Sequence, residues 1–217
     1  MKSFNRVWVT FIVVVCAAVI SCATVNKSGD QQVRLKEPRI KPLTETQWNA
    51  EQQRLLSMLR GRDGRIININ TTLAHHPRMM ANFLPFSRYI LKESTLPPRD
   101  REILILRTGW LCQSEYEFGQ HTLVGKSVGL TPNEITRITK GPDAPGWDPF
   151  DVALMRAADE LHSNTFITDA TWNALTKRYN EQQMIDLVMT VGQYNLVCMF
   201  LNTFDVPLDP GIPGFPK

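Results

Sequence analysis

The chain has little cysteine, and this scarcity limits the chemistry that thiols can carry. Four cysteines occur in 217 residues. Cys16 and Cys22 belong to an N-terminal targeting segment, which leaves Cys112 and Cys198 for the folded domain. In an oxidising compartment these two could form a disulfide, but each stands in an apolar helical context that is typical of a core. We therefore expect two free, buried thiols.

The sequence also lacks an excess of charge of one sign. Its 24 Lys and Arg and 21 Asp and Glu give a formal net charge of +3. The first 21 residues contain two of the basic groups and no acidic group, so 22 basic groups face 21 acidic groups in the rest of the chain. This balance provides no basic field for nucleic acid, and we expect no nucleic-acid partner.

The N-terminal apolar run is short. Val7–Ile20 spans 14 residues after a basic start, which is too short for a comfortable transmembrane helix and typical of a secretory signal. The run ends in VISC, which resembles the bacterial lipobox. We expect residues 1–21 to be a lipoprotein signal peptide and Cys22 to be lipidated; secretion without a lipid and an uncleaved anchor are the alternatives. Several acyl chains would anchor the protein stably in a membrane.

The residues after the lipobox predict a location and a tether. Ala23 follows the cysteine, without an aspartate, which in a Gram-negative cell resembles the pattern of lipoproteins sent to the outer membrane. We predict a lipid-anchored protein of the bacterial cell envelope, on the periplasmic side of the outer membrane if the host is Gram-negative. Residues 22–43 are polar and charged and predict a flexible tether. The domain, 44–217, would begin at the capping box of Thr44 and Gln47.

No stretch alternates convincingly with period two, so the sequence predicts an all-α fold. Helices are expected from Thr44 to Gly61, Arg78 to Glu93, about 98 to 111, 115 to 128, from 132, from 149 to about 161, from 168, and from 181 to about 204. Ile67–Ile69 is expected to be a connector. The last helix is strongly apolar, which places it in the core or at a subunit interface. Two helix-rich halves around Gly141–Trp147 suggest an internal repeat.

Residues 96–135 concentrate the plausible chemistry. Ser114, Glu117 and His121 follow the spacing i, i+3, i+7 and share one helix face. A carboxylate one turn before an imidazole can fix its tautomer and raise its pKa. Glu102 lies on the preceding helix and would reach the same face if the two helices pair antiparallel. Such a group suits proton transfer; the alternative is a surface Glu–His pair with Glu102 in a capping turn.

This stretch resembles the carboxymuconolactone decarboxylase and alkyl hydroperoxidase D superfamily. The resemblance is carried by LPPR from Leu96, REI from Arg101, ILR from Ile105 and SEYEFGQH from Ser114, and it covers about Asn68 to Pro210. It implies an all-α bundle of the alkyl hydroperoxidase D-like type with an internal repeat. It also implies homo-oligomers, commonly trimers or hexamers, and no metal or organic cofactor.

The chain departs from the hydroperoxidase branch at the cysteines. That branch carries C-x-x-C-x-x-x-H, with a glutamate twelve residues before the first cysteine. Glu102 and His121 match this pattern, but Ser114 and Glu117 occupy the two cysteine positions. A dithiol peroxidase needs a thiolate and a resolving thiol. The cysteine-free, decarboxylase-like branch is therefore the better match, and a dithiol peroxidase mechanism is not expected.

The resemblance implies a lyase or isomerase that acts on a small-molecule substrate, a carboxylated lactone or related acid. His121 would be the general acid/base, Glu117 its orienter and Glu102 a second proton carrier. Substrate binding would involve Ser114 and also Tyr116 and Arg107, although Arg107 can equally form a structural ion pair. The alternatives are residual peroxide-linked redox chemistry through Cys112, without the C-x-x-C pair, and a non-catalytic binding protein.

Other polar groups have simpler interpretations. His75 and His76 would point about 100° apart on a helix and make a poor metal chelate. Asp159, Glu160 and His162 are interpreted as surface or helix-end charge. In the last helix Gln193 and Tyr194 are polar exceptions that could face the site, and in the helix before it Trp172 and Leu175 are expected to point inward.

Overall fold

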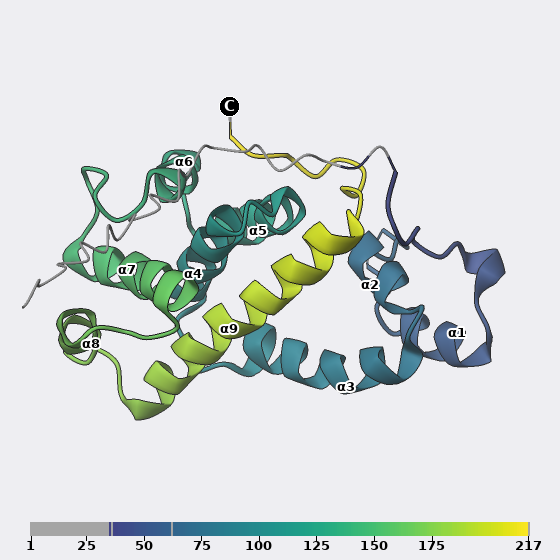
Figure 1. Cartoon of the computed structure of the whole chain (residues 1–217), viewed down its shortest axis with the longest axis horizontal. Coiled ribbons are helices and arrows are strands. Elements are labelled where there is room, and N and C mark those ends of the chain that lie inside the picture. Colours follow the sequence, from purple (N-terminus) through teal and green to yellow (C-terminus); the bar gives the residue numbers. More distant parts are fainter. Residues whose placement is uncertain (1–34, 36, 62, 217) are drawn as a thin grey trace, which may run out of the picture. The chain divides into compact units, whose positions relative to one another are not determined.

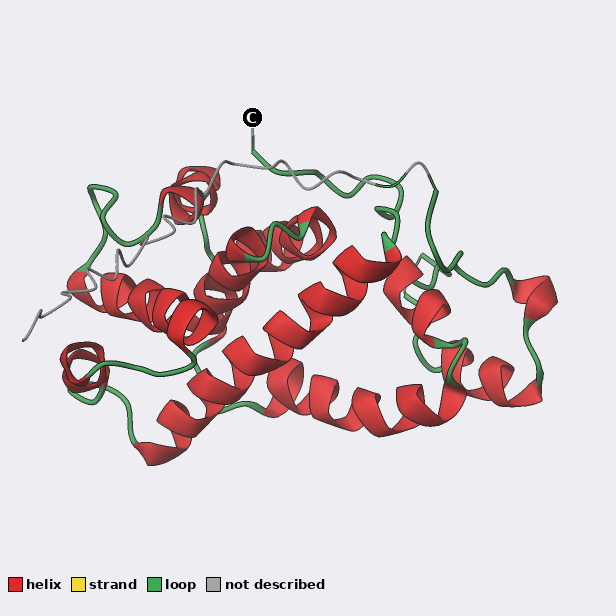
Figure 2. Ribbon diagram, viewed as in Figure 1, coloured by secondary structure: helices red, strands yellow, loops and turns green. Residues whose placement is uncertain are grey.

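The computed structural model describes residues 35, 37–61 and 63–216. The predicted signal peptide, the predicted lipidation site Cys22 and most of the predicted tether therefore lie outside the described residues. The described residues belong to one unit, Arg34–Lys217. Within them the chain forms helices and loops and no strand (Figure 2), which confirms the predicted all-α fold.

Nine α-helices and two short helical turns follow one another in the described part of the chain (Figure 1). In order they are the 3₁₀ turn η1 (Glu45–Gln47), α1 (Ala50–Ser57), α2 (Asn68–Leu73), α3 (Pro77–Arg88), the π-helical turn η2 (Tyr89–Glu93), α4 (Pro98–Leu111), α5 (Glu115–Ser127), α6 (Pro132–Lys140), α7 (Pro149–Asn164), α8 (Asp169–Leu175) and α9 (Glu181–Phe204).

Helix α4 is the centre of this unit. The ten successive residues Asp100–Gly109 are all buried, because α5, α6, α7 and α9 all pack against α4. Its N-terminal end is held by charge: the Arg99 guanidinium donates two hydrogen bonds to Asp151 of α7 and one to Glu134 of α6. Charged side chains that are buried among apolar neighbours need ion-pair or hydrogen-bond partners, because an unpaired buried charge destabilises the folded state.

Helices α4 and α5 form a tight antiparallel pair. The chain reverses at Gln113, whose φ is +53°. A Cβ on Gly109 would lie 3.4 Å from the backbone nitrogen of Phe118, and one on Gly125 would lie 3.3 Å from Leu106. The end of α4 thus lies beside the start of α5, and an earlier part of α4 lies beside the end of α5, so the two helices are antiparallel. This is the pairing that was expected to bring Glu102 towards α5. The absence of a side chain at both glycines allows the backbones to approach closely.

The first helix and the Ile67–Ile69 connector differ from the prediction. The first α-helix begins at Ala50, not near Thr44, because Trp48 leaves the helical conformation and Asn49 makes its own capping box with Gln52. Ile67–Ile69 is not a plain connector: α2 begins at Asn68. Chain contacts also start before Thr44, where the backbone N–H of Leu43 donates to Thr71 O and that of Arg39 donates to Phe204 O.

Helix α9 has one buried and one exposed apolar face. The buried face, which includes Leu187, Val191 and Leu201, packs on α4, α5 and α7 and confirms the predicted core position. The other face exposes Ile185, Val188, Met189, Leu196 and Met199. By length and composition alone α9 could span a membrane, but 56% of that window is buried in the protein. In α8, Leu175 is buried as predicted, whereas Trp172 is 45% exposed, so its predicted inward position is wrong.

The residues after α9 run without helix back over α5 (yellow in Figure 1). The ring of Phe215 lies 5.0 Å from Trp110 and 5.4 Å from Phe118, centroid to centroid. Gly119 of α5 lies directly beneath the tail, since a Cβ there would lie 2.2 Å from the carbonyl oxygen of Pro213. The tail therefore covers α5 and fixes one side of the candidate site described next.

Candidate functional site

The imidazole of His121 lies between two carboxylates. Its Nδ1 is 2.6 Å from Oε2 of Glu102, which α4 supplies. Its Nε2 is 3.0 Å from Oε1 of Glu117, one turn earlier on α5. All three side chains are buried, Glu102 completely. The structure therefore brings together the three residues that the sequence proposed as catalytic, by the helix pairing on which that proposal depended.

Alternating charges stabilise this arrangement. Arg101 donates through Nε to Oε1 of Glu102 at 3.2 Å, which gives the order Arg101, Glu102, His121, Glu117. Burial by itself would lower the pKa of His121, but the charges of Glu102 and Glu117 and their hydrogen bonds outweigh it and raise that pKa to about 10. At neutral pH the ring is therefore an imidazolium, and both of its N–H groups donate to carboxylates.

Helix α9 supplies the next wall of the site. The ring of Tyr194 meets that of His121 edge to face, with centroids 5.0 Å apart. Burial raises the pKa of Tyr194, and Glu117 and Glu102 add to this, so the phenol stays neutral. Next to it, Gln193 is buried and its Oε1 has no hydrogen-bond partner. Both residues line the pocket, as the sequence suggested.

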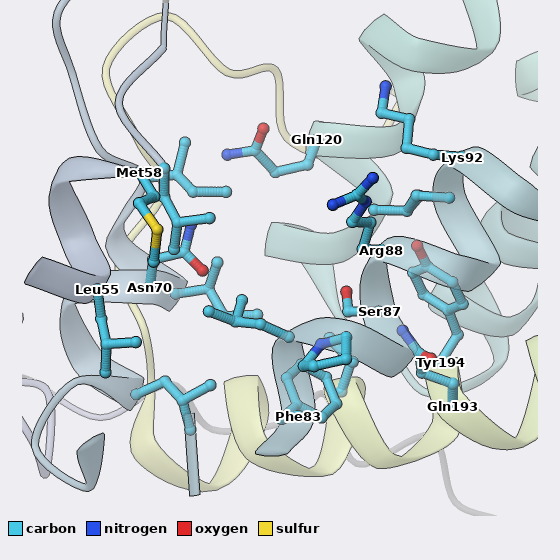
Figure 3. Close-up of a pocket in the computed structure, with 18 of the residues that line it drawn as sticks. Leu55, Met58, Asn70, Phe83, Ser87, Arg88, Lys92, Gln120, Gln193 and Tyr194 are labelled. Carbon is cyan, nitrogen blue, oxygen red and sulfur yellow. The ribbon is translucent and has the colours of Figure 1, made fainter. Parts of the chain in front are cut away.

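A pocket of about 930 Å³ opens against Glu117 and His121. Its walls come from α1, α2, α3, η2, α5 and α9, and many of them are apolar: Leu55, Met58, Leu59, Ile69, Leu73, Phe83, Leu84, Leu91 and Val197. Figure 3 shows Leu55 and Met58 on one side of the space and Arg88, Lys92 and Tyr194 on the other. A largely apolar cavity with a few convergent polar groups is the usual form of a small-molecule site.

Besides His121, three cationic residues line this pocket: Arg54 of α1, Arg88 of α3 and Lys92 of η2. All three are exposed, and Arg88 pairs with Glu93 at 3.1 Å on the surface. They place positive charge around the opening, whereas the wall formed by Glu117 and His121 is buried. An anionic group of a ligand would be attracted to the opening.

Tyr116 also lines the pocket, but its hydroxyl is engaged. It donates to Oδ2 of Asp209 in the C-terminal tail at 2.5 Å and accepts from the backbone N–H of Ile69 at 3.2 Å. Burial and the Asp209 carboxylate raise the pKa of Tyr116. Tyr116 therefore joins α5, α2 and the tail at the edge of the pocket.

The other two predicted substrate-binding residues do not line the pocket. Arg107 donates through Nε and Nη2 to the Asp159 carboxylate, at 2.5 and 3.0 Å, and through Nη1 to Ile138 O at 2.9 Å. This is the structural ion pair that the sequence left open. Ser114 is fully buried at the N-terminus of α5, with no hydrogen-bond partner for its Oγ.

The second acid–histidine group lies near the C-terminal end of α7, in agreement with the helix-end interpretation, and its members have partners within the protein. Asp159 binds Arg107. Glu160 accepts hydrogen bonds from Thr168 and Thr171 at the start of α8. His162 is half-buried, with Nδ1 2.7 Å from Oδ1 of Asn195.

The paired histidines before α3 have local partners. Nε2 of His75 lies 2.9 Å from the carbonyl oxygen of Lys41. Nδ1 of His76 accepts a hydrogen bond from the backbone N–H of Met79 and so caps α3. Their side chains serve the backbone at two different places.

The apolar residues of α3 were expected to be core or to line a pocket, and Phe83 and Leu84 line it. Sequence reasoning missed the cationic residues of this wall. Arg88 and Lys92 carry no motif, and only their four-residue spacing on one helical run indicates a shared face.

The central part of the chain matches a known family in sequence. Residues 77–160, from α3 to α7, match the model of the carboxymuconolactone decarboxylase family. The matched range contains Glu102, Glu117 and His121. No curated protein matches the chain.

Solved structures share the fold over most of the chain. A peroxidase-related protein from Ralstonia eutropha JMP134, described as an alkylhydroperoxidase AhpD core, has a TM-score of 0.70 at 16% identity, covering 80% of this chain and 93% of that one. A peroxidase-related protein from Silicibacter sp. TM1040 has a TM-score of 0.67 at 15% identity, covering 82% and 93%. The debrominase Bmp8 in complex with 2,3,4-tribromopyrrole has a TM-score of 0.61 at 14% identity, covering 81% and 94%.

These identities establish the fold and nothing finer. Residues 77–160 are thus similar in sequence to the carboxymuconolactone decarboxylase family, and the fold of the described residues is similar to that of AhpD-like structures.

Proposed function

We propose that this chain is a proton-transfer enzyme of the carboxymuconolactone decarboxylase-like type, and that its substrate is a small carboxylic acid or its lactone. One observation carries the proposal. A buried imidazolium, held between Glu102 and Glu117, stands at the wall of a pocket of about 930 Å³. Perturbed titratable groups that converge on a pocket are the physical signature of acid–base catalysis.

The geometry supports a division of roles that differs from the one first expected. Both nitrogens of His121 are occupied by carboxylates, so the ring has no lone pair with which to accept a proton. Glu117 lines the pocket and is the group that would meet the substrate. Glu102 does not line the pocket and holds the ring. Glu117 would therefore be the general base, and His121 would supply the balancing positive charge. Glu102, to which Arg101 donates a hydrogen bond, would hold the His121 ring in position.

The substrate's own carbonyl group can accept the electron pair that the reaction releases. Glu117 removes a proton from the carbon next to the carbonyl, and the C–H electron pair moves towards the carbonyl oxygen as an enolate. Return of the proton to another carbon completes an isomerisation. In a decarboxylation, the C–C electron pair moves to the carbonyl oxygen as CO₂ leaves, and the carbanion then takes a proton from water, delivered through Glu117. The charge of His121 offsets the developing negative charge in a site from which much water is excluded.

The pocket accounts for the class of substrate. Arg54, Arg88 and Lys92 would attract a carboxylate at the opening, and the apolar walls would cover a small ring. The debrominase complex, with 2,3,4-tribromopyrrole bound, is a case of this fold with a small ring compound. The family's namesake compound, 4-carboxymuconolactone, combines a small ring, a lactone carbonyl and a carboxylate, which makes it the first substrate to test.

The test uses the full chain in detergent with 4-carboxymuconolactone, followed by CO₂ release and by deuterium uptake from D₂O into carbon. We expect turnover in the wild type, a loss of at least about 100-fold in Glu117→Gln, and a similar loss in His121→Gln, because general acid–base groups contribute about 10²–10⁴-fold. The matched control is Lys126→Gln, an exposed residue on the same helix, which should retain wild-type rates. Deuterium uptake that is equal in wild type and Glu117→Gln would contradict the assigned base. No uptake or CO₂ from this compound or from related small acids would remove the proposed reaction class.

We further propose that the chain is a lipoprotein of the bacterial cell envelope, anchored through Cys22. The support is the VISC sequence at the end of the short apolar run. Labelling of bacteria with a clickable fatty acid should tag the wild type, and Cys22→Ser should lose the tag. Cys16→Ser is the matched control, since Cys16 would leave with the signal peptide. A tag that persists in Cys22→Ser would contradict the anchor.

A further inference from the structure

The two cysteines of the folded domain meet, although they lie far apart in the sequence. Cys112 is the C-cap residue of α4, and Cys198 lies in the C-terminal half of α9. Both are free thiols, and Sγ of Cys112 lies against α9, 3.3 Å from Oδ1 of Asn195, which is one turn before Cys198 on that helix. The two helices are also joined beside them, because Nδ2 of Asn202 on α9 donates to the carbonyl oxygen of Cys112 at 2.8 Å.

The two thiols have unequal surroundings. Cys112 is half-buried, and its Sγ lies 3.3 Å from Oδ1 of Asn195 and 3.6 Å from Nδ1 of His162. Cys198 is completely buried. The neighbouring thiol of Cys198 lowers the pKa of Cys112 in spite of burial, which raises it; the Cys112 thiol and burial both raise the pKa of Cys198. The accessible thiol is thus the one that ionises more readily, and the buried one keeps its proton.

Cys112 has one polar neighbour that favours its thiol and one that can favour its thiolate. The S–H of Cys112 donates to Oδ1 of Asn195, which favours the thiol, whereas the ring of His162 is placed to donate to the ionised sulfur. Nδ2 of Asn195 donates to Val191 O at 2.9 Å, which fixes the amide so that Oδ1 faces Cys112 and His162. Because Nδ1 of His162 lies 2.7 Å from that oxygen, Nδ1 carries the ring proton. The same N–H lies next to Sγ of Cys112 and can donate to it once the sulfur is ionised.

We propose that Cys112 and Cys198 form a thiol–disulfide redox pair, with Cys112 as the nucleophile, Cys198 as the resolving thiol and small-molecule disulfides as the exchange partners. The Cys112 thiolate attacks one sulfur of the disulfide; a mixed disulfide forms and one thiolate leaves. Cys198 then loses its proton to water and attacks Sγ of Cys112, and the second thiolate leaves. The small disulfide gains two electrons and becomes two thiols, and the protein loses two electrons in forming one disulfide.

This redox pair goes beyond the proton-transfer function and does not depend on it. Neither cysteine lines the pocket that Glu117 and His121 share. The pair also differs from a C-x-x-C arrangement, because its sulfurs come from two helices that pack in the core.

The experiment equilibrates the full chain in mixtures of reduced and oxidised dithiothreitol, quenches with acid, alkylates free thiols and maps peptides without reduction. We expect a peptide that links Cys112 to Cys198, with a two-electron dependence on the dithiothreitol ratio. Cys112→Ser and Cys198→Ser should each abolish it. With glutathione disulfide as the probe, Cys198→Ser should accumulate glutathione on Cys112, whereas Cys112→Ser should leave Cys198 unmodified while the far-UV spectrum stays that of the wild type.

Two results would overturn the pair. One is full alkylation of both cysteines in wild type at every ratio, including oxidised dithiothreitol alone. The other is glutathione labelling of Cys198 in Cys112→Ser that equals the labelling of Cys112 in Cys198→Ser. This result would contradict Cys112 as the thiol that attacks first. A readout that does not require a cysteine replacement is the rate of alkylation of Cys112 at pH 7. His162→Gln should slow it severalfold, and an unchanged rate would contradict the role of the Nδ1–H.

Discussion

Oε2 of Glu102 lies 2.6 Å from Nδ1 of His121, and this contact joins the two central helices across 19 residues of sequence. The carboxylate is completely buried, and its other oxygen accepts a hydrogen bond from Arg101. An uncompensated carboxylate at such a position would be very costly. The contact therefore serves the fold and the candidate site at once, and its effect on His121 can be measured.

The first prediction concerns pH and stability. The pKa of His121 is raised from 6.5 to about 10. A group whose pKa is higher in the folded state stabilises that state while it is charged, so its contribution is complete below pH 6.5 and is lost as the pH rises towards 10. We expect the free energy of unfolding to decrease between pH 6.5 and 10. Urea unfolding at a series of pH values measures this decrease, and His121→Gln should reduce the slope. An unchanged slope in the variant would show that other groups cause it.

The second prediction concerns the pocket opening. Arg88→Gln and Lys92→Gln should each raise KM for a carboxylate substrate about two- to fivefold, with little change in kcat, because exposed charges contribute modestly to binding. The effect should shrink at 0.5 M salt, since salt screens exposed charges. Steady-state kinetics at low and high salt provides the measurement. Arg78→Gln, an exposed change in α3 at a residue that does not line the pocket, is the control. Equal KM values for the wild type, Arg88→Gln, Lys92→Gln and Arg78→Gln would exclude the pocket opening as the carboxylate site.

The third prediction separates Arg107 from substrate binding. Arg107→Met removes the partner of Asp159 and the donors to Ile138 O and Thr139 O. Breaking a largely buried pair leaves an uncompensated charge, so we expect a loss of roughly 3 kcal/mol in the free energy of unfolding. At a temperature where the variant is folded, KM should match that of the wild type. A raised KM in a protein of wild-type stability would return Arg107 to the substrate site.

Local sequence signals predicted helix starts well. Helices were expected to begin at about residues 132, 149 and 181, and α6, α7 and α9 begin there, each directly after a capping residue: Thr131, Asp148 and Asn180. Each needs only the residues within one turn, so no tertiary information is required. The predicted start of the first helix was wrong because Thr44 and Asn49 both form capping boxes. Only the conformation of Trp48, between them, determines which of the two begins the α-helix.

The candidate site was predictable where it depends on one helix pair and not where it depends on distant packing. The spacing of Glu117 and His121, with an antiparallel pairing of α4 and α5, was enough to predict that Glu102 lies beside them. Arg107 and Asp159 are 52 residues apart, and nothing in either segment specifies the other. The roles of the two nitrogens of His121 also required coordinates, because spacing shows proximity and not which atom meets which carboxylate.

The fourth prediction concerns the C-terminal tail. A methyl group at Gly119 would meet the Pro213 carbonyl at 2.2 Å, so Gly119→Ala must displace the tail. We expect a loss of about 1–3 kcal/mol in the free energy of unfolding, as for other overpacked sites, and faster hydrogen exchange in the tail. Lys126→Ala, an exposed change on the same helix, is the control and should change the free energy of unfolding by no more than about 0.5 kcal/mol. A Gly119→Ala protein as stable as Lys126→Ala would mean that the tail does not lie on α5.

The fifth prediction concerns the exposed apolar face of α9, which we propose as the interface between copies of this chain in a trimer or hexamer. Ile185, Leu196 and Met199 are 62%, 55% and 67% exposed and follow helical spacing along one stripe, whereas the opposite face is committed to the core. Isolated apolar side chains on a surface are ordinary, but a continuous stripe along a 24-residue helix indicates a covered surface. Leu196→Glu with Met199→Glu should shift the protein in detergent towards the mass of one chain in light scattering, with an unchanged helical spectrum. Gln182→Glu, an exposed change on the same helix, should leave the mass unaltered. A wild-type protein that is already monomeric at micromolar concentration would show that copies of the chain do not cover this face.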